Sequence, residues 1–119
     1  MSDYKELIVW RRAFALVKDV YLITAKFPAD ERFGLVSQMR RAAISIPSNV
    51  AEGCSRRSVR EFAQFISHAE GSAAELETQF LLSGDLGYVR GECLEKVLAG
   101  LTEIRKMLGS LRRRLSTKS

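Results

Sequence analysis

The chain has few cysteines, prolines and histidines, and each of these low counts excludes some classes of structure or site. Its 119 residues include two cysteines, two prolines and one histidine. Cys54 and Cys93 are far apart and lack CxxC or Cys/His spacing, so we expect reduced thiols, with neither a disulfide framework nor a zinc site. Because only Pro28 and Pro47 interrupt the chain, we expect disorder at the ends at most.

Long hydrophobic runs are also missing. No apolar segment approaches the roughly 20 residues needed to cross a bilayer. The first residues, MSDYKE, resemble no secretory signal, since they lack a charged leader and a small-residue cleavage site. Hydrophobic residues make up 46% and charged residues 28% of the chain, which is typical of soluble globular proteins. We therefore expect one cytoplasmic domain, residues 1–119, with no membrane partner.

What the sequence does contain is helical periodicity. Apolar residues spaced by three and four predict helices over about residues 4–26, 33–53, 58–86 and 91–114, with a short basic tail at 115–119. Phe27-Pro28 stops the first helix, Gly53 in a left-handed conformation is expected to end the second, and Ser58 to Glu61 forms a capping box. No segment alternates with period two. The pattern predicts an all-α fold, a single antiparallel up-down four-helix bundle with a proline-kinked second helix.

Each predicted helix has an apolar seam expected to face the core. In the first helix the seam consists of Leu7, Trp10, Phe14, Val17, Tyr21 and Thr24. The third and fourth helices carry comparable seams, from Val59 to Phe80 and from Leu94 to Leu115. A patch of small residues around Gly71 favours close approach of another helix there, whereas Gly100 and Gly109 are expected to be merely tolerated.

The segment Arg40–Gly53, RRAAISIPSNVAEG, places a proline deep inside a helix. Pro47 lacks an N–H and crowds the preceding turn, which costs about 3 kcal/mol without compensation. Hydrogen bonds from Ser45 and Ser48 to carbonyls one turn back are one expected compensation. Beyond its core seam, the helix has a polar side and a third, mostly apolar strip. Two readings stay open: a kinked core helix with a solvated polar face, or a helix that also builds a subunit interface, through Ile44, Ser45, Pro47, Ser48, Asn49 and Glu52.

Positive charge is unevenly distributed. The net charge is +5, with a pI of about 9.6. The last fifteen residues hold six cations and no acid, and further arginines lie near the turn into the third helix. We expect these cations to bind RNA or DNA backbone with little sequence discrimination, although basic residues also suit a helix C-terminus and aid solubility. No basic stripe interleaved with aromatic residues is evident. The candidate binding residues are Arg56, Arg57, Arg60, Arg105, Lys106, Arg112, Arg113 and Arg114.

Catalytic patterns are weak. A di-iron bundle needs paired Glu-x-x-His motifs, but His68 is alone and Phe65 stands where its glutamate should be. Cys54 follows a helix C-terminus, whose dipole opposes a thiolate. Glu75 and Glu77 point about 200° apart on a helix and cannot share a small site. We therefore expect no catalytic residue, metal or cofactor, and no enzyme.

Several motifs together resemble a known family. RRAAISIPSNVAEG, preceded by YKELIVWRRAFALVKDVY and FGLVSQMR and followed by AELETQ, is similar to the four-helix-bundle family of 23S rRNA intervening-sequence proteins of bacteria. The resemblance covers nearly the whole chain. It implies a homo-oligomer, a ring of five subunits, and a relation to the accessory variability-determinant proteins of diversity-generating retroelements, basic rings that bind nucleic acid and work with a reverse transcriptase.

Two functions are compatible with these observations. The first is a non-enzymatic, ring-forming protein associated with RNA or DNA through its basic surface. The second is a homo-oligomeric scaffold whose partner is another protein, with no role for nucleic acid. Nothing in the residues decides between them.

Overall fold

Four long helices make up most of the molecule. The computed structural model describes residues 3–118, and within them the helices are α1 (Ile8–Thr24), α2 (Leu35–Cys54), α3 (Val59–Asp85) and α4 (Gly91–Lys118). Two short 3-10 helices, η1 (Tyr4–Glu6) and η2 (Ala29–Glu31), precede α1 and α2. This part of the chain contains no strand. The all-helical fold predicted from periodicity is confirmed.

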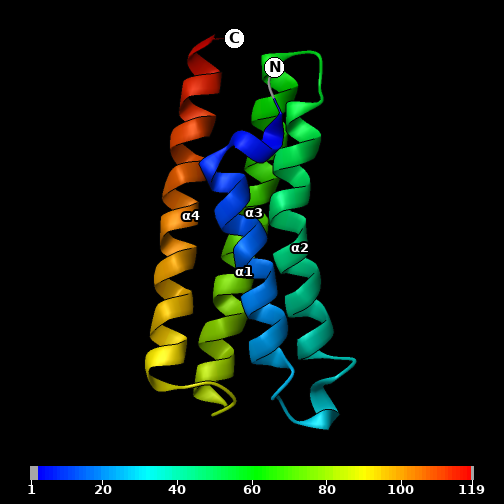
Figure 1. The fold of residues 1–119 in the computed structure, drawn as a ribbon, viewed down its shortest axis with the longest axis vertical. Helices are drawn as coiled ribbons and strands as arrows, with labels where there is room; N and C mark the ends of the chain where they lie inside the picture. The colour runs from blue at the N-terminus through cyan, green and yellow to red at the C-terminus, as the bar shows by residue number, and fades with distance from the viewer. Residues whose placement is uncertain (1–2, 119) are drawn as a thin grey trace.

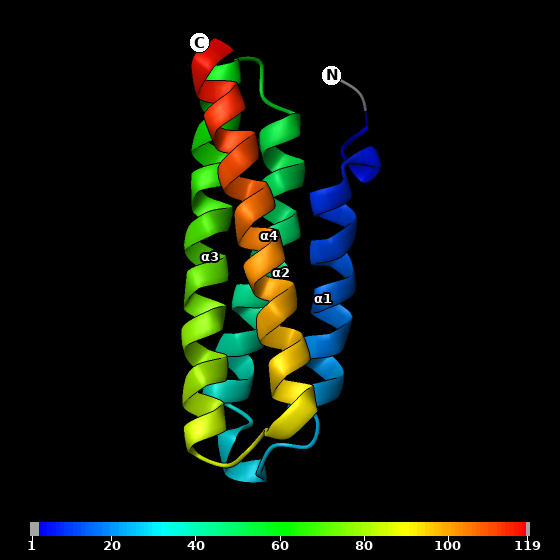
Figure 2. The same ribbon diagram turned by 90° about the vertical axis from the view of Figure 1, so that its left-hand side faces the viewer.

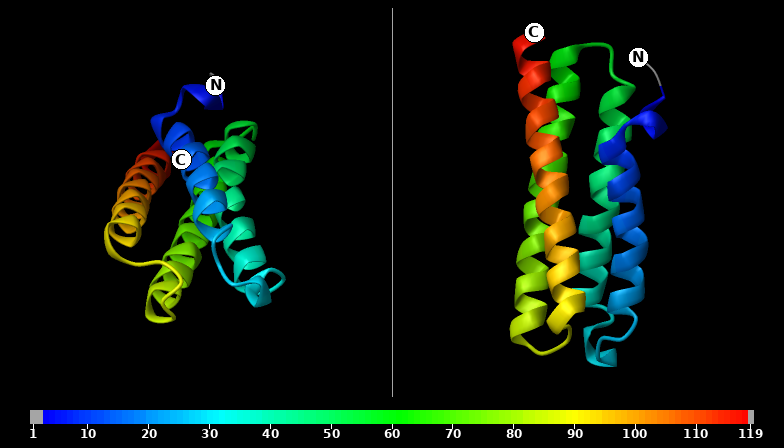
Figure 3. Two further views of the ribbon diagram at one scale, coloured as in Figure 1. Left: turned by 60° about the horizontal axis from the view of Figure 1, so that its bottom comes forward. Right: turned by 60° about the vertical axis from the view of Figure 1, so that its left-hand side comes forward.

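Successive helices run in opposite directions along a body measuring 45 × 24 × 20 Å (Figure 1). The α2–α3 turn and the C-terminal part of α4 lie at one end, which we call the C-terminal end. The opposite end, where η2 and the α3–α4 connection lie, is called the η2 end (Figures 2 and 3). No helix of the described residues is both long enough and apolar enough to cross a membrane.

The seams of α2, α3 and α4 form most of the core. In α2, spacing by three and four predicts a core seam of Val36, Met39, Ala43, Ile46 and Val50, and all five residues are buried. The α3 seam is buried from Phe62 to Phe80, with only Val59 at its start exposed. α2 packs most extensively on α3, and α3 on α4, while α1 contacts α2 more than it contacts α4. The three-helix unit of α2, α3 and α4 is therefore the best-packed part of the bundle.

The predicted seam of α1 is wrong by one residue. α1 buries Val9, Ala13, Leu16, Val20 and Thr24, whereas Phe14 and Tyr21 of the predicted seam remain 49% and 40% exposed. Since neighbouring residues lie 100° apart on a helix, the aromatic stripe is turned away from the core. Trp10 is half-buried, with its ring 4.9 Å from that of Phe14. α1 thus carries an aromatic face on the outside of the bundle.

α2 continues without interruption through Pro47, which is buried. Ser45 does not bond a carbonyl as predicted. Its hydroxyl lies 2.7 Å from that of Ser72 on α3, and the Asn49 side-chain amide donates to the carbonyl and hydroxyl oxygens of Ser45, at 2.8 and 2.9 Å. Part of the polar side of α2 therefore packs on α3 rather than facing solvent. The kink itself stays a prediction.

Helix ends differ from prediction at several points. Gly53 lies inside α2, which ends at Cys54, and the positive φ angles of the described residues occur at Gly87 and Gly91 instead. Residues 115–118 are not a tail, because α4 runs to Lys118 and buries Leu115; residue 119 lies outside the described residues. The chain before α1 is a separate 3-10 turn with Leu7 extended. Each difference lengthens or divides a predicted helix without changing the fold.

The start of α3 matches the predicted capping box closely. Ser58 Oγ accepts from the Glu61 amide at 3.1 Å and donates to Glu61 Oε2 at 3.1 Å. At the start of α2, Glu31 Oε1 instead accepts from the Leu35 amide at 3.3 Å. Ser58 and Glu31 thus each satisfy one exposed helix amide, and the carboxylates of Glu31 and Glu61 complement the positive helix N-termini.

Gly53 is required for packing, and Gly71 is not. A Cβ at Gly53 would meet Phe62 Cδ1 at 2.8 Å and Phe65 Cβ at 2.9 Å. A Cβ at Gly71 would meet nothing within 4 Å, so this glycine itself is not needed for close approach. Other small residues of the predicted patch do pack closely, since Ala73 is fully buried and Ser72 Oγ lies 2.7 Å from Ser45 Oγ of α2. Gly53 therefore allows α2 and α3 to approach closely at the end of α2.

We predict that Gly53→Ala and Gly71→Ala change stability in opposite directions. Overpacking against two phenylalanines costs about 1–3 kcal/mol, which exceeds the gain in helix propensity. Gly71→Ala removes only the cost of about 1 kcal/mol that glycine has in a helix. In urea unfolding, the midpoint concentration of urea should be lower for Gly53→Ala and higher for Gly71→Ala than for the unmodified protein. Shifts in the same direction would contradict this packing.

The two cysteines differ in environment. Cys54 is buried and Cys93 is exposed. Burial, and then the nearby negative charge of Asp3, raise the pKa of the Cys54 thiol above its ordinary value. Since the thiolate is the reactive form, Cys54 is poorly suited to act as a nucleophile.

We predict that a thiol reagent labels Cys93 quickly and Cys54 slowly in the folded protein. In a Cys93→Ser variant, where Cys54 alone reports, labelling should be slow at neutral pH, because burial and a raised pKa both lower the amount of accessible thiolate. The rate should rise on adding denaturant. Equally fast labelling of both thiols in the native state would show that Cys54 is not protected.

Candidate nucleic-acid interface

Most of the predicted basic residues lie toward the C-terminal end of the bundle. Because the helices alternate in direction, the α2–α3 turn, with Arg57 and Arg60, lies at the same end as Arg113 and Arg114 of α4 (Figure 1). All four side chains are exposed. Two clusters that are more than fifty residues apart in sequence thus contribute to one end of the molecule.

Three of the eight predicted residues are paired with acids. Arg56 lies 2.5 Å from Glu52 and Arg105 lies 2.5 Å from Glu77. Arg112 Nε donates to Glu70 at 2.6 Å. Such partly exposed pairs contribute at most about 1 kcal/mol each to stability, but they partly neutralise the charge. The predicted cations that form no ion pair with a described residue are Arg57, Arg60, Lys106, Arg113 and Arg114.

The acidic partners Glu70 and Glu77 come from α3, so the arginines of α4 serve two purposes. Arg105 and Arg112 lie on the α3 side of α4 and join the two helices. Lys106 and Arg114 line a hollow between α4 and the start of α1. The basic segment is therefore a helix with a structural side and a free side, rather than a uniformly charged arm.

The residues predicted for a subunit interface do not share one exposed face. Pro47 is buried, and Ser45 and Asn49 are half-buried against α3. Ile44 and Ser48 reach the surface, where they line a hollow of about 340 Å³ together with Trp10, Phe14 and other residues of α1 and α2. The apolar strip of α2 thus faces a surface that it shares with the aromatic side of α1.

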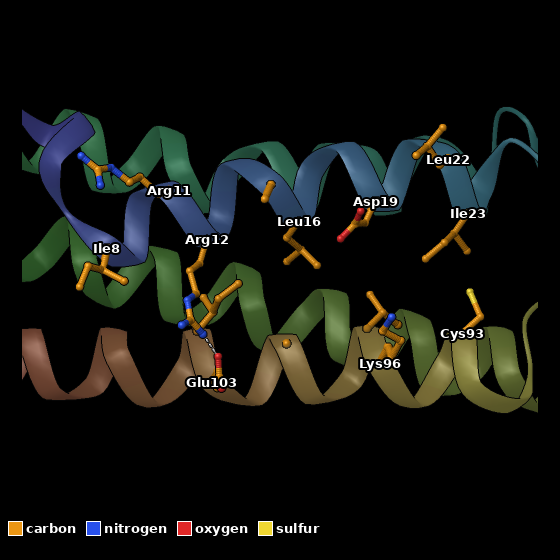
Figure 4. Close-up of a pocket in the computed structure, with 14 residues that line it drawn as sticks. Ile8, Arg11, Arg12, Leu16, Asp19, Leu22, Ile23, Cys93, Lys96 and Glu103 are labelled. Carbon is orange, nitrogen blue, oxygen red and sulfur yellow. Dashed lines mark ion pairs between the residues drawn. The ribbon is translucent and has the colours of Figure 1, made fainter.

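A hollow of about 800 Å³ lies between α1 and α4 (Figure 4). Leu16 and Ile23 of α1 face α4 across it, and an ion pair between Arg12 and Glu103 joins the two helices. Cys93 lies at its η2 end. The described residues contain no group of three or more His, Cys, Asp or Glu side chains able to hold a metal. His68 is exposed on α3, with its ring 5.8 Å from that of Phe65, and does not line this groove.

Sequence reasoning missed one basic and aromatic surface. Arg32 and Phe33, which follow η2, lie around the same hollow as Tyr21 of α1 and Arg40 and Arg41 of α2. In the sequence, the only sign of this surface is the pair of local clusters Arg32-Phe33 and Arg40-Arg41. Their meeting with Tyr21 depends on the return of the chain from α1 to α2, which brings arginines and aromatic rings together in space although the sequence has no basic stripe interleaved with aromatic residues.

Comparison with known proteins agrees with the fold. The family model described as 23S rRNA-intervening sequence protein matches residues 5–110. A similar solved structure is the 1.70 Å crystal structure of a protein of unknown function from the S23 ribosomal protein family of Bacteroides thetaiotaomicron VPI-5482. It is 25% identical, with a TM-score of 0.80 over 88% of this chain and 98% of that chain. The comparison with curated proteins gave no match. Since the family match spans most of its length, the chain belongs to the 23S rRNA-intervening sequence protein family.

Proposed function

We propose that this protein is a non-enzymatic, ring-forming homo-oligomer that associates with the backbone of RNA or DNA. The observation that carries the proposal is the set of exposed cations that form no ion pair, defined above, on the α2–α3 turn, at the start of α3 and on α4. Cations that are not neutralised within the chain are available to phosphates, and binding them releases condensed counterions. The name of the matching family points to rRNA genes and is consistent with such a role.

Oligomerisation is the second part of the proposal. A single subunit offers few phosphate contacts, each of them weak, but several copies in one assembly add their contacts through multivalency. A closed ring needs two different faces on each subunit that fit one another. The bundle has separate apolar surfaces available for this, at the α1–α4 groove and on the aromatic side of α1 near Ile44. Five subunits are the number that the family resemblance implies.

A protein scaffold is the second candidate. Its support is the apolar surface itself, since Leu22 and Ile8 at the edge of the α1–α4 groove are 70% and 61% exposed. Contiguous exposed apolar residues are typical of protein–protein contacts. The partner would be a second copy, a reverse transcriptase or another protein. Partners that remain bound after nuclease treatment favour the scaffold, and partners that are lost favour nucleic-acid association.

We predict that nucleic-acid affinity falls steeply with salt and depends on the unpaired arginines. Neutralising Arg57, Arg113 and Arg114 to glutamine should weaken binding for all sequences. If each contacts one phosphate, the slope of log affinity against log salt should decrease by about three for a duplex. Fluorescence anisotropy over a series of salt concentrations measures both quantities.

A matched control uses the same charge change at the other end. Lys26 and Arg90 lie in the connections at the η2 end and Lys96 lies near the start of α4, and their neutralisation to glutamine should leave the duplex slope nearly unchanged. Equal losses in both triple variants would mean that total charge matters rather than the C-terminal end. Salt-independent binding, or no binding at low salt, would contradict the proposed nucleic-acid role.

We predict a mass of about five subunits in solution, on the basis of the family resemblance. Light scattering coupled to size-exclusion chromatography measures this mass directly. The mass should persist at high salt, because we expect apolar contacts rather than ion pairs to hold the assembly. A monomer at micromolar concentration would contradict the ring in both candidate functions.

A further inference from the structure

The hollow at the η2 end, between α1 and α2, combines arginines with exposed aromatic rings. It measures about 510 Å³. Phe33 is 90% exposed and Tyr21 is 40% exposed. Its lining contains three arginines and no acidic residue: Tyr21, Arg32, Phe33, Val36, Ser37, Arg40, Arg41 and Ile44. A single exposed phenylalanine is ordinary on a protein surface, but aromatic rings gathered with arginines around one hollow are not.

The arginines of this hollow have no acidic partner, although Arg32 lies 5.6 Å from the centre of the Phe33 ring. None of Arg32, Arg40 and Arg41 forms an ion pair with any residue of the described chain. The nearest acidic side chain along the chain, Glu31, is engaged elsewhere, accepting from the Tyr88 hydroxyl at 2.9 Å and from the Leu35 amide at 3.3 Å. The hollow therefore has an uncompensated positive charge.

One arginine also fixes the aromatic geometry. The Arg40 guanidinium lies 4.3 Å from the centre of the Tyr21 ring, and it donates to Thr24 Oγ1 at 3.0 Å and to the Tyr21 carbonyl at 3.3 Å. These contacts join α2 to the last turn of α1 and hold Tyr21 in place. A ring and a guanidinium that are already ordered lose little conformational entropy when a ligand stacks on them. Arg41 and Arg32 are exposed and can reach phosphates around this platform.

We propose that this hollow binds a segment of single-stranded nucleic acid, with a base stacked on Phe33 or Tyr21 and phosphates held by Arg32 and Arg41. Unpaired bases stack on aromatic side chains and on guanidinium planes, whereas the bases of a duplex are already stacked on one another. The charge of the hollow favours a polyanion over an apolar or acid-poor protein surface. RNA and DNA strands share the required phosphate and base chemistry.

This site is separate from the basic C-terminal end. Arg32 and Phe33 of the hollow follow η2 at one end of a body 45 Å long, and the cations of the α2–α3 turn lie at the other end. A strand of about four nucleotides, a small site size for single-strand binding, can therefore fill the hollow without contacting the C-terminal end. The inference rests on the proposed function and refines it. The C-terminal end contacts backbone of any form, whereas the η2 end selects unpaired strands.

The test compares short oligouridylate, short oligothymidylate and a hairpin duplex by fluorescence anisotropy, using the full chain. Phe33→Ala should lower single-strand affinity between about fivefold and a hundredfold, the range expected for one lost stacking contact, with no change in salt slope. Arg41→Gln should lower the single-strand slope by about 0.7. Duplex affinity should stay the same in the Phe33 variant, and Phe33→Trp should retain binding. Comparing the affinities for oligouridylate and oligothymidylate shows whether the hollow prefers RNA or DNA.

Matched controls keep the inference falsifiable. Leu81→Ala removes an exposed apolar side chain outside the hollow, and Arg90→Gln removes an exposed arginine at the same end; both should bind single strands as the unmodified protein does. If Phe33→Ala also binds normally while the protein binds nucleic acid, the inference is wrong and the proposed function stands. If Phe33→Ala changes only the oligomeric mass, the hollow belongs to a contact between copies. If the unmodified protein binds neither form at low salt, both fail.

Discussion

The surface of this bundle depends on a packing constraint in α1: the helix has two apolar stripes and can bury only one against its neighbours. It buries the stripe of smaller residues, with Ala13 and Val20 fully enclosed. Small side chains let helices approach closely, and close approach maximises dispersion contacts in the core. The aromatic stripe, including Phe14 and Tyr21, consequently remains outside. An apolar surface that the bundle does not need for its own core is therefore available for a partner.

The arrangement of the remaining helices gives the two ends of the molecule different surfaces. α2, α3 and α4 pack as a well-buried unit, and the alternation of helix direction brings unpaired cations to the C-terminal end while Phe33 and Tyr21 lie toward the η2 end. Ion pairs between α3 and α4 use part of the positive charge for structure. What remains is a backbone-binding surface at one end and, in our proposal, a base-stacking surface at the other.

The packing of apolar stripes also explains which parts of the fold could be predicted from the sequence. The seams of α2, α3 and α4 were predictable because each helix has one dominant apolar stripe, whereas the two stripes of α1 made the choice ambiguous to periodicity. The pairs Arg105–Glu77 and Arg112–Glu70 join residues 28 and 42 positions apart. No local pattern predicts such distant pairs, nor the meeting of Tyr21 with Phe33. The fold and the family could therefore be predicted from the sequence, but the arrangement of charged side chains and aromatic rings could be seen only in the structure.

The most direct test of this two-ended account is ultraviolet crosslinking of the assembled protein to a short single strand, followed by mass spectrometry of tryptic peptides. Tyr21 and Phe33 fall in the separate peptides DVYLITAK, residues 19–26, and FGLVSQMR, residues 33–40. These two peptides should carry the base adducts, and excess unlabelled single strand should remove the adducts while duplex should not. Adducts confined to peptides of α3 and α4, or insensitive to competing single strand, would contradict this two-ended account.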